Sequence, residues 1–389
     1  MNSHGKDILL ISMLFLVNSL AIDMISPIWP IFISSLGASI TELGLVFAIS
    51  NAVGAAMQIP SGLLSDRYGR RQLHLLGTFL TIFSPLAYAF ASGWADLIPW
   101  LALSGFATGL YLPIRWAIVA DLSASQNMAS AYSWTNIAWL GGSTIAPFIG
   151  GWTADALGLR FPFFTCFALR FLVLPIALFV RETGRKPGRV ADEGRNPRTN
   201  TETSHLYTMV WISLINVVQG VGMGITGPII PIFVITNFQV DYTFIGILYA
   251  IGFGVASILA QAPGARLSNL FDRRKIMLVT FVASSPFFLL FYYSRSTLEL
   301  LLFMFLSNLV LNLHWPAYQT YLMDATPSSK WGFVNGVSAT TFWIGVMVGN
   351  LVGGILWQFW GLQSAFYASC CAIGLSALPL LPLKRVRAS

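Results

Sequence analysis

Long apolar runs alternate with short polar segments along the whole chain. Twelve runs reach 19 residues or more, and about 20 apolar residues suffice for a helix to cross a bilayer. Within the runs apolar residues are continuous and do not alternate with period two, which excludes a β-barrel. The pattern predicts an all-α membrane protein with helices over 8–34, 42–63, 72–92, 97–121, 131–153, 160–181, 205–237, 243–265, 276–294, 298–323, 333–355 and 362–383.

The longest polar segment divides the chain into halves. Residues 182–204 contain nine charged residues and two prolines, a composition typical of a solvated linker that forms no core. We therefore expect an N-terminal six-helix bundle over 1–181, a cytoplasmic linker over 182–204 and a C-terminal six-helix bundle over 205–389.

The two halves repeat each other in sequence. A shift of 203 residues pairs Ser65 with Ser268, Arg70–Arg71 with Arg273–Arg274, Pro113 with Pro316, Asp121 with Asp324, Gly150–Gly151 with Gly353–Gly354 and Gly158 with Gly361. Near the first helix the shift is 201, which pairs Pro27 and Pro30 with Pro228 and Pro231. One register held over several helices indicates a duplication, so the two bundles should be pseudo-symmetric.

Composition and charge agree with a membrane protein. The 389 residues are 56% hydrophobic and 10% charged, whereas soluble domains have roughly 25% charged residues. With the N-terminus inside, 18 of the 22 Lys and Arg residues lie in cytoplasmic segments. This is the positive-inside rule. We therefore attribute the net charge of +7 to membrane topology. We expect a cell-membrane protein with cytoplasmic termini and no nucleic-acid partner.

Cysteines and local motifs exclude several other classes. Cys166, Cys370 and Cys371 all lie in apolar runs, so we interpret them as packing residues and not as a disulfide framework or zinc site. The first run continues for about 26 residues, longer than the roughly 7–15 residues of a signal peptide's apolar region. The sequence contains no phosphate-binding loop and no H-E-x-x-H motif. We expect no cofactor, no metal site and no enzymatic activity.

The turn after the second predicted helix carries a ten-residue motif. Residues 62–71 read GLLSDRYGRR and fit G-x-L-x-D-R-x-G-R-R at every fixed position. This resembles the signature of the major facilitator superfamily, at the place where that family has it, and the repeat extends the resemblance over the whole chain. The resemblance implies a secondary transporter that works by alternating access, with its site between the halves near the middle of the membrane.

In that family this loop is a clamp that holds the cytoplasmic side closed in the outward-open state. Asp66 would face the positive N-terminal end of the eleventh helix, and Arg70 would pair with Asp121. The alternative is that the basic cluster only fixes topology. The predicted clamp comprises Gly62, Asp66, Arg67, Gly69, Arg70, Arg71 and Asp121. Its second copy comprises Asn269, Arg273, Arg274 and Asp324, and it is degraded, because Asn269 replaces the charge of Asp66.

The fifth predicted helix carries a second motif. Residues 142–151 read GSTIAPFIGG and resemble the family's G-x-x-x-G-P-x-x-G-G motif, which is associated with antiporters and especially with multidrug:proton exporters. Small residues at this spacing allow helices to cross closely; plain packing with no bearing on transport direction is the alternative. The predicted packing residues are Gly142, Ala146, Pro147, Gly150 and Gly151, with Gly345, Gly349, Gly353 and Gly354 in the eleventh helix.

Asp23 is the one carboxylate predicted deep within a span. Together with Pro27 and Pro30 it resembles the D-x-x-x-P-x-x-P arrangement of some drug exporters. A charge at the bilayer centre costs about 2.5–3.5 kcal/mol on the insertion scale, and burial can make a carboxylate exchange protons near neutral pH. We predict that Asp23 couples transport to protons; a fixed structural ion pair is the alternative.

Two arginines within spans are candidate partners of Asp23. At about 1.5 Å per residue, Asp23 lies roughly 22 Å from the cytoplasmic end of its helix. Measured in the same way along their own helices, Arg170 lies roughly 16 Å and Arg115 about 9 Å from the cytoplasmic end. The count favours Arg170, whereas Arg115 would reach toward the headgroups or join Asp121. The sequence departs from the exporter pattern at Gly105, where those proteins usually carry an arginine.

Polar residues on single helix faces are the candidates for a substrate cavity. Amide groups that face lipid would be costly, and Asn308, Asn312, Trp315 and Gln319 lie on one face of the tenth helix. Interhelical hydrogen bonding is the alternative. The predicted cavity residues are Ser19, Ser26, Trp29, Asn216, Gln219, Asn308, Asn312, His314, Trp315 and Gln319.

Together these features predict a transporter of the twelve-helix drug:proton antiporter type. We expect a proton-coupled exporter of amphipathic or drug-like small molecules that acts as a monomer. A proton symporter or facilitator for a small metabolite, or a transport-dead membrane sensor, is the alternative.

Overall fold

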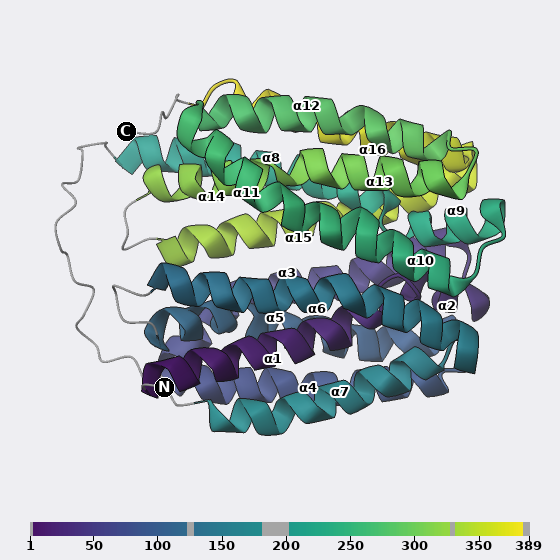
Figure 1. The fold of residues 1–389 in the computed structure, drawn as a ribbon, viewed down its shortest axis with the longest axis horizontal. Coiled ribbons are helices and arrows are strands. Elements are labelled where there is room, and N and C mark those ends of the chain that lie inside the picture. Colours follow the sequence, from purple (N-terminus) through teal and green to yellow (C-terminus); the bar gives the residue numbers. More distant parts are fainter. Residues whose placement is uncertain (1–2, 123–127, 181–201, 327–330, 384–389) are drawn as a thin grey trace. The chain divides into compact units, whose positions relative to one another are not determined.

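A computed structural model describes residues 3–122, 128–180, 202–326 and 331–383 of the chain. Every regular element in these residues is helical, so the all-α prediction is confirmed (Figure 1). Eleven stretches in the described residues are long and apolar enough to cross a membrane. The remaining predicted run, 131–153, lies in the 30-residue helix α6 (Met128–Leu157).

The helices of the first sequence half follow the predicted runs. Local capping sets where some begin: at α3 the Ser39 hydroxyl accepts from the Glu42 amide, and the Glu42 carboxylate accepts from the Ser39 amide. The elements are α1 (Ser3–Ile25), α2 (Trp29–Ser35), α3 (Ile40–Tyr68), α4 (Arg70–Phe90), η1 (Trp94–Asp96), α5 (Leu97–Leu122), α6 and α7 (Phe161–Phe179).

The second sequence half is more finely divided. A π-helical turn, η2 (Ala250–Val255), lies inside the eighth predicted run. The elements are α8 (Glu202–Thr226), α9 (Ile229–Phe238), α10 (Tyr242–Tyr249), η2, α11 (Ala256–Leu270), α12 (Arg273–Tyr292), α13 (Thr297–Asn312), α14 (His314–Asp324), α15 (Trp331–Trp360), α16 (Leu362–Leu375) and η4 (Leu378–Leu380).

Prolines interrupt two runs that the sequence predicts as single helices. Pro27 lies in the gap between α1 and α2, and Pro228 lies between α8 and α9. A proline has no backbone N–H to donate within a helix. Each run therefore keeps its apolar length but forms a long helix followed by a short one.

The structure repeats contacts in the two halves at the sequence offset. The Arg71 guanidinium donates to the Leu178 carbonyl, and Arg274 donates to the Leu381 carbonyl at 3.0 Å. The turns after α6 and α15 are also alike, because Gly158 and Gly361 have φ of +95° and +82°. This left-handed conformation favours glycine. The duplication is thus present in hydrogen bonds and backbone geometry.

Two compact units contain the described helices. Unit one comprises Met1–Arg185 with Pro228–Val255, and unit two comprises Lys186–Gly227 with Ala256–Ser389. The core of unit one includes Phe15, Ile114 and Val173, and that of unit two includes Phe281 and Tyr321. The predicted linker 182–204 lies largely outside the described residues, and the predicted bundle boundaries stay a prediction.

Candidate functional site

The Asp23 carboxylate receives a hydrogen bond from α6. Asp23 lies on α1, two residues before the helix ends, and its side chain is half-buried. The Ser143 hydroxyl donates to Asp23 Oδ2. Sequence reasoning gave Ser143 no role, because only the folded chain shows that α1 and α6 are neighbours at this level.

Arg115 is the arginine whose charge acts on Asp23. Its guanidinium carbon lies 5.1 Å from the ring centroid of Phe15 on α1 and 4.1 Å from that of Trp139 on α6. Stacking on these rings holds the cation inside unit one through cation–π attraction. With 8% of its surface exposed, Arg115 is buried and does not reach toward the headgroups. The other predicted alternative, that Arg115 joins Asp121, involves a side chain outside the described residues.

Arg170, the predicted partner of Asp23, lies among other groups. Arg170 is buried on α7, near Cys166, Tyr111 and Tyr88. Arg170 as the partner of Asp23 stays a prediction, and Arg115 is the arginine that this structure favours. Counting depth along each helix ignored the direction of the side chain, which for Arg115 is set by the two aromatic rings.

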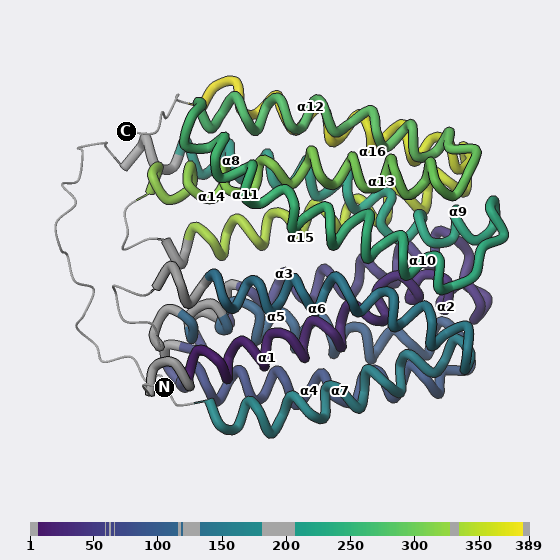
Figure 2. The backbone as a smooth tube through the Cα atoms, in the orientation of Figure 1, coloured from purple at the N-terminus to yellow at the C-terminus, as the bar shows by residue number. Residues whose placement is uncertain are grey.

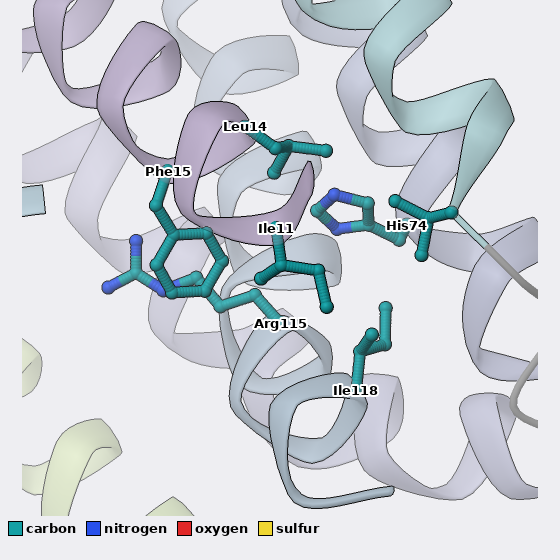
Figure 3. A pocket seen from close by; sticks show the side chains of 7 residues that line it. Ile11, Leu14, Phe15, His74, Arg115 and Ile118 are labelled. Carbon is teal, nitrogen blue, oxygen red and sulfur yellow. The ribbon is translucent and has the colours of Figure 1, made fainter. Parts of the chain in front are cut away.

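A small pocket lies beside Arg115 on the predicted cytoplasmic side of Asp23. Figure 3 shows its mainly aliphatic and aromatic wall with His74 and Arg115 as the polar members. His74 has 3% of its surface exposed, and its Nδ1 has no hydrogen-bond partner among the described residues. The ring of Tyr111 lies edge-on at 5.8 Å from that of His74. His74 is a buried polar residue that the sequence analysis missed, since a lone histidine in a helix carries no pattern.

The predicted clamp is described only in part. The side chains of Gly62, Asp66 and Asp121 lie outside the described residues. Gly69 joins α3 to α4 with φ of +94°, a conformation that explains the glycine in the motif. The Arg67 guanidinium lies 5.4 Å from the Tyr68 ring centroid. Arg70 is half-buried at the start of α4, directly before Arg71.

The second copy of the clamp is described more fully. Arg273 at the start of α12 forms a salt bridge with Asp324 at the end of α14, the counterpart of the predicted Arg70–Asp121 pair. Arg274 donates to the carbonyls of Leu381 and Leu383. Asp272, which stands where the first copy has Gly69, accepts from the Arg274 amide and begins α12. Asn269 is exposed on α11.

The packing motif of α6 contacts two helices at close range. A Cβ on Gly142 would lie 1.9 Å from Ser19 Oγ of α1, and one on Gly150 would lie 1.8 Å from the Met24 carbonyl oxygen. Ala146, between them, is fully buried. Pro147 and Gly151 instead approach α10. The motif therefore fixes α6 against α1 on one face and against α10 on another.

The corresponding motif of α15 is placed against α8. A Cβ on Gly345, Gly349 or Gly353 would lie 2.3 Å from a carbonyl oxygen of Val217, Val221 or Ile225. Gly354 is buried on the same helix. Gly150 with Met24 and Gly353 with Ile225 are repeat counterparts, at offsets of 203 and 201.

Close packing also accounts for the departure from the exporter pattern on α5. A Cβ on Gly105 would lie 2.3 Å from the Ser50 carbonyl oxygen of α3. No larger side chain fits there unless α3 and α5 separate. The position at which the exporter pattern has an arginine is a helix contact in this protein.

Among the predicted cavity residues, Asn216 belongs to a polar network in unit two. Its Nδ2 lies 2.8 Å from the Tyr318 hydroxyl and 3.0 Å from Ser338 Oγ, so α8, α14 and α15 are joined. Gln219, one turn further along α8, is buried. This is the interhelical hydrogen bonding that the sequence left as an alternative.

The polar stripe of the tenth predicted helix is divided between α13 and α14. Asn308 and Asn312 donate to carbonyls of α13. Trp315 has 47% of its surface exposed and stacks on Tyr318 with ring centroids 5.8 Å apart. Gln319 is half-buried. This stripe stays a candidate for substrate contact.

Three predicted cavity residues are instead buried in helix packing, and the prediction is corrected for them. Ser19 donates to its own helix and lies against Gly142. The ring centroid of Trp29 lies 4.5 Å from that of Tyr88 and 5.0 Å from that of Phe163. His314 packs against Phe281 at 4.8 Å and contacts the Leu311 carbonyl. Polarity along one helix could not tell a cavity wall from a helix interface. Ser26, just after α1, is exposed.

Long apolar helices in a repeated arrangement, with a carboxylate and an arginine inside the membrane, define a polytopic transporter. The family model described as Major Facilitator Superfamily matches residues 11–215 and again 212–389. The chain belongs to this superfamily, and it is a multi-pass membrane transporter of small molecules, not an enzyme. Each match covers one copy of the internal repeat.

Curated relatives include named efflux pumps. The chain is 26% identical over 368 residues to "Multi-drug resistance efflux pump PmrA" of Streptococcus pneumoniae, covering 92% of this chain and 91% of that one. It is 22% identical over 350 residues to "Quinolone resistance protein NorA" of Staphylococcus aureus, covering 87% of each.

Solved structures share the fold at low sequence identity. The D-xylose-proton symporter has a TM-score of 0.79 at 15% identity and covers 98% of both chains. The human organic anion transporter MFSD10 has a TM-score of 0.72 at 17% identity, covering 98% of this chain and 100% of that one.

Proposed function

We propose that the protein is a proton-coupled exporter of amphipathic, drug-like small molecules that works by alternating access. One observation carries the proposal: the Ser143 hydroxyl of the antiporter-type motif donates to the Asp23 carboxylate. The names of the relatives PmrA and NorA, an efflux pump and a resistance protein, support the same direction and substrate class.

Proton uptake at Asp23 would change the contact between α1 and α6. As an anion, Asp23 accepts from the Ser143 hydroxyl, and the positive charge of Arg115 acts on it. A protonated carboxyl is itself a donor, so the hydrogen bond to Ser143 reverses. Protonation also removes the negative charge that acts on the buried Arg115, in a site of low dielectric where charges interact strongly. Proton binding therefore alters the helix contact that carries the antiporter motif.

The described residues of unit two favour an aromatic or amphipathic substrate. Trp315 and Tyr318 present stacked rings, and Trp315 is half exposed. Aromatic faces bind planar apolar groups and cations. A strongly ionic substrate such as phosphate would need paired arginines, and the stripe that contains Trp315 carries none.

The setting follows from the same proposal. We place the protein in the cell membrane as a monomer, with both termini in the cytoplasm, because the Lys and Arg residues concentrate in the segments assigned to that side. Protons and the small-molecule substrate are its partners in transport.

Reconstitution into liposomes that contain a pH-sensitive dye tests the proposal. Cationic, neutral and anionic amphipathic compounds are added in turn. We expect that transport of cationic or neutral compounds in one direction is accompanied by movement of protons in the opposite direction. Movement of both in the same direction would establish symport, and substrate flux without proton movement would establish a facilitator. The absence of any flux would support the sensor.

A further inference from the structure

A segment of the second sequence half belongs to unit one in the structure. Residues 228–255 follow the linker in sequence, yet they cluster with residues 1–185. The segment begins at Pro228, in the break between α8 and α9, and ends with the π-helical turn η2. Figure 2 shows the backbone continuing from α10 into α11. The membrane-spanning stretch Tyr242–Leu270 therefore changes unit at Val255.

Helix α6 approaches this segment at three successive levels. A Cβ on Gly151 would lie 2.2 Å from the Tyr242 carbonyl oxygen, and one on Gly246 would lie 2.4 Å from the Pro147 carbonyl oxygen. Further into the span, a Cβ on Gly254 would lie 2.8 Å from the Thr144 Cα. Thr144 directly follows Ser143, the donor to Asp23. We name this contact the α6–α10 seam.

A carboxylate closes the end of the seam. Asp155, on the last turn of α6, accepts from the Tyr242 amide at 3.0 Å and from the Thr243 amide at 2.7 Å. The Thr243 hydroxyl also donates to Asp155 Oδ2. These two amides are the first of α10, where the helix dipole is positive and amides lack partners within the helix. Asp241 caps the same helix from within its own segment by accepting from the Phe244 amide at 2.8 Å.

We propose that Asp155 is a latch residue that holds the segment 228–255 on α6 in one state of the transport cycle and releases it in the other. The proposal rests on alternating access, as proposed above, but not on proton coupling. The latch lies at the membrane face opposite the predicted cytoplasmic clamp. The interaction is of the kind predicted for Asp66. In both cases a carboxylate of one sequence half lies at the N-terminal end of a helix from the other sequence half.

The ends of the segment are suited to movement. The break at Gly227–Pro228 separates α8 from α9, and proline removes a helical hydrogen bond there. π-Helical turns are rare and frequently occur at functional sites. Because Gly151, Gly246 and Gly254 have no Cβ atoms, the two helices can approach closely at these levels. The hydrogen bonds that Asp155 accepts from α10 add an interaction that depends on the relative orientation of the two helices.

The first test compares Asp155→Asn with Asp241→Asn in intact cells. Both variants remove one negative charge at the start of α10, but only Asp155 belongs to α6. The probe is Thr144→Cys, which puts a thiol in the seam without enlarging the side chain. The background lacks Cys166, Cys370 and Cys371, and the thiol is labelled with a membrane-impermeant maleimide. We expect Asp155→Asn to raise the labelling rate about tenfold, equivalent to about 1.4 kcal/mol, and Asp241→Asn to leave it unchanged. Equal rates in the two variants would overturn the proposal.

A cross-link tests the latch in purified protein, whether or not substrate is moved. Asp155→Cys and Thr243→Cys are combined in the same cysteine-free background. We expect the pair to form a disulfide that protects Thr144→Cys from the maleimide until it is reduced, while each single variant shows no response to oxidant. A cross-link that leaves the labelling of Thr144→Cys unchanged would contradict the latch. A failure of proton coupling alone would leave both results intact.

Discussion

At the scale of single residues, the two buried arginines of unit one are stabilised differently. Arg115 lies between the rings of Phe15 and Trp139, and cation–π contacts are worth about 2 kcal/mol or more when desolvated. Arg170 instead lies near Tyr88, Tyr111 and Cys166. Arg115 is therefore the cation that can respond to the charge of Asp23, and Arg170 is better placed to hold α7 against α4 and α5.

Tyr318→Phe should destabilise unit two without affecting Asp23. The substitution removes a hydroxyl that bonds to Asn216 and Ser338, and one such bond contributes about 1 kcal/mol. We expect a lower midpoint of thermal unfolding for the purified protein. Ser284→Ala is the control, because Ser284 is as deeply buried but donates only to its own helix. Equal midpoints in the two variants would show that the network adds no stability.

Single residues also show what the sequence could and could not predict. Asp23 was found because a carboxylate in a long apolar run is unusual. Ser143 and His74 were missed because their roles depend on which helices are neighbours. Ser19 and Trp29 were assigned to a cavity because periodicity shows that residues share a helix face but not what that face contacts.

At the scale of elements, α6 connects the proposed proton site to the proposed latch. Gly142 and Gly150 lie against α1, whereas Pro147 and Gly151 lie against α10. A shift of α6 relative to α1 would therefore change the contacts in the α6–α10 seam. This gives the antiporter-type motif a physical role, since small residues allow close contact on two helix faces at once.

Gly150→Ala should destabilise the protein strongly. The new Cβ would lie 1.8 Å from the Met24 carbonyl oxygen, so α1 and α6 must separate, and overpacking of this kind costs about 1–3 kcal/mol or more. We expect a marked loss of folded protein by size-exclusion chromatography in detergent. Gly141→Ala, on the same helix with no atom within 4 Å of the new Cβ, should be neutral or slightly stabilising. A Gly150→Ala variant as stable as Gly141→Ala would contradict the close approach.

Hydropathy predicts where the helices lie, but it does not predict the local breaks within them. Every predicted run corresponds to helix in the structure, because lipid requires backbone hydrogen bonds to be satisfied within the segment. The division of 205–237 into α8 and α9, and the π-helical turn in 243–265, were not predicted. Pro228 could have signalled the first break, whereas the π-turn sequence AIGFGV differs little from ordinary membrane helix.

At the scale of the whole molecule, the duplication explains which features recur and which do not. Arg71 and Arg274 make matching bonds, and Gly158 and Gly361 make matching turns. The chemistry is not duplicated: the offset places no carboxylate opposite Asp23, because its counterpart is Gly224. Gly224 lies in close contact with Val346. We therefore expect proton handling in the first half alone.

The most direct measurement compares wild type, Asp23→Asn and Asp96→Asn in proteoliposomes loaded with the compound that the screen identifies. Each is assayed for export driven by a pH gradient and for exchange of labelled against unlabelled compound without a gradient. We predict that Asp23→Asn loses gradient-driven export but keeps exchange within about twofold of wild type, a difference of about 0.4 kcal/mol. Asp96→Asn, which removes an exposed carboxylate at the end of η1, should retain both activities. Gradient-driven export by Asp23→Asn at the wild-type rate would contradict the account.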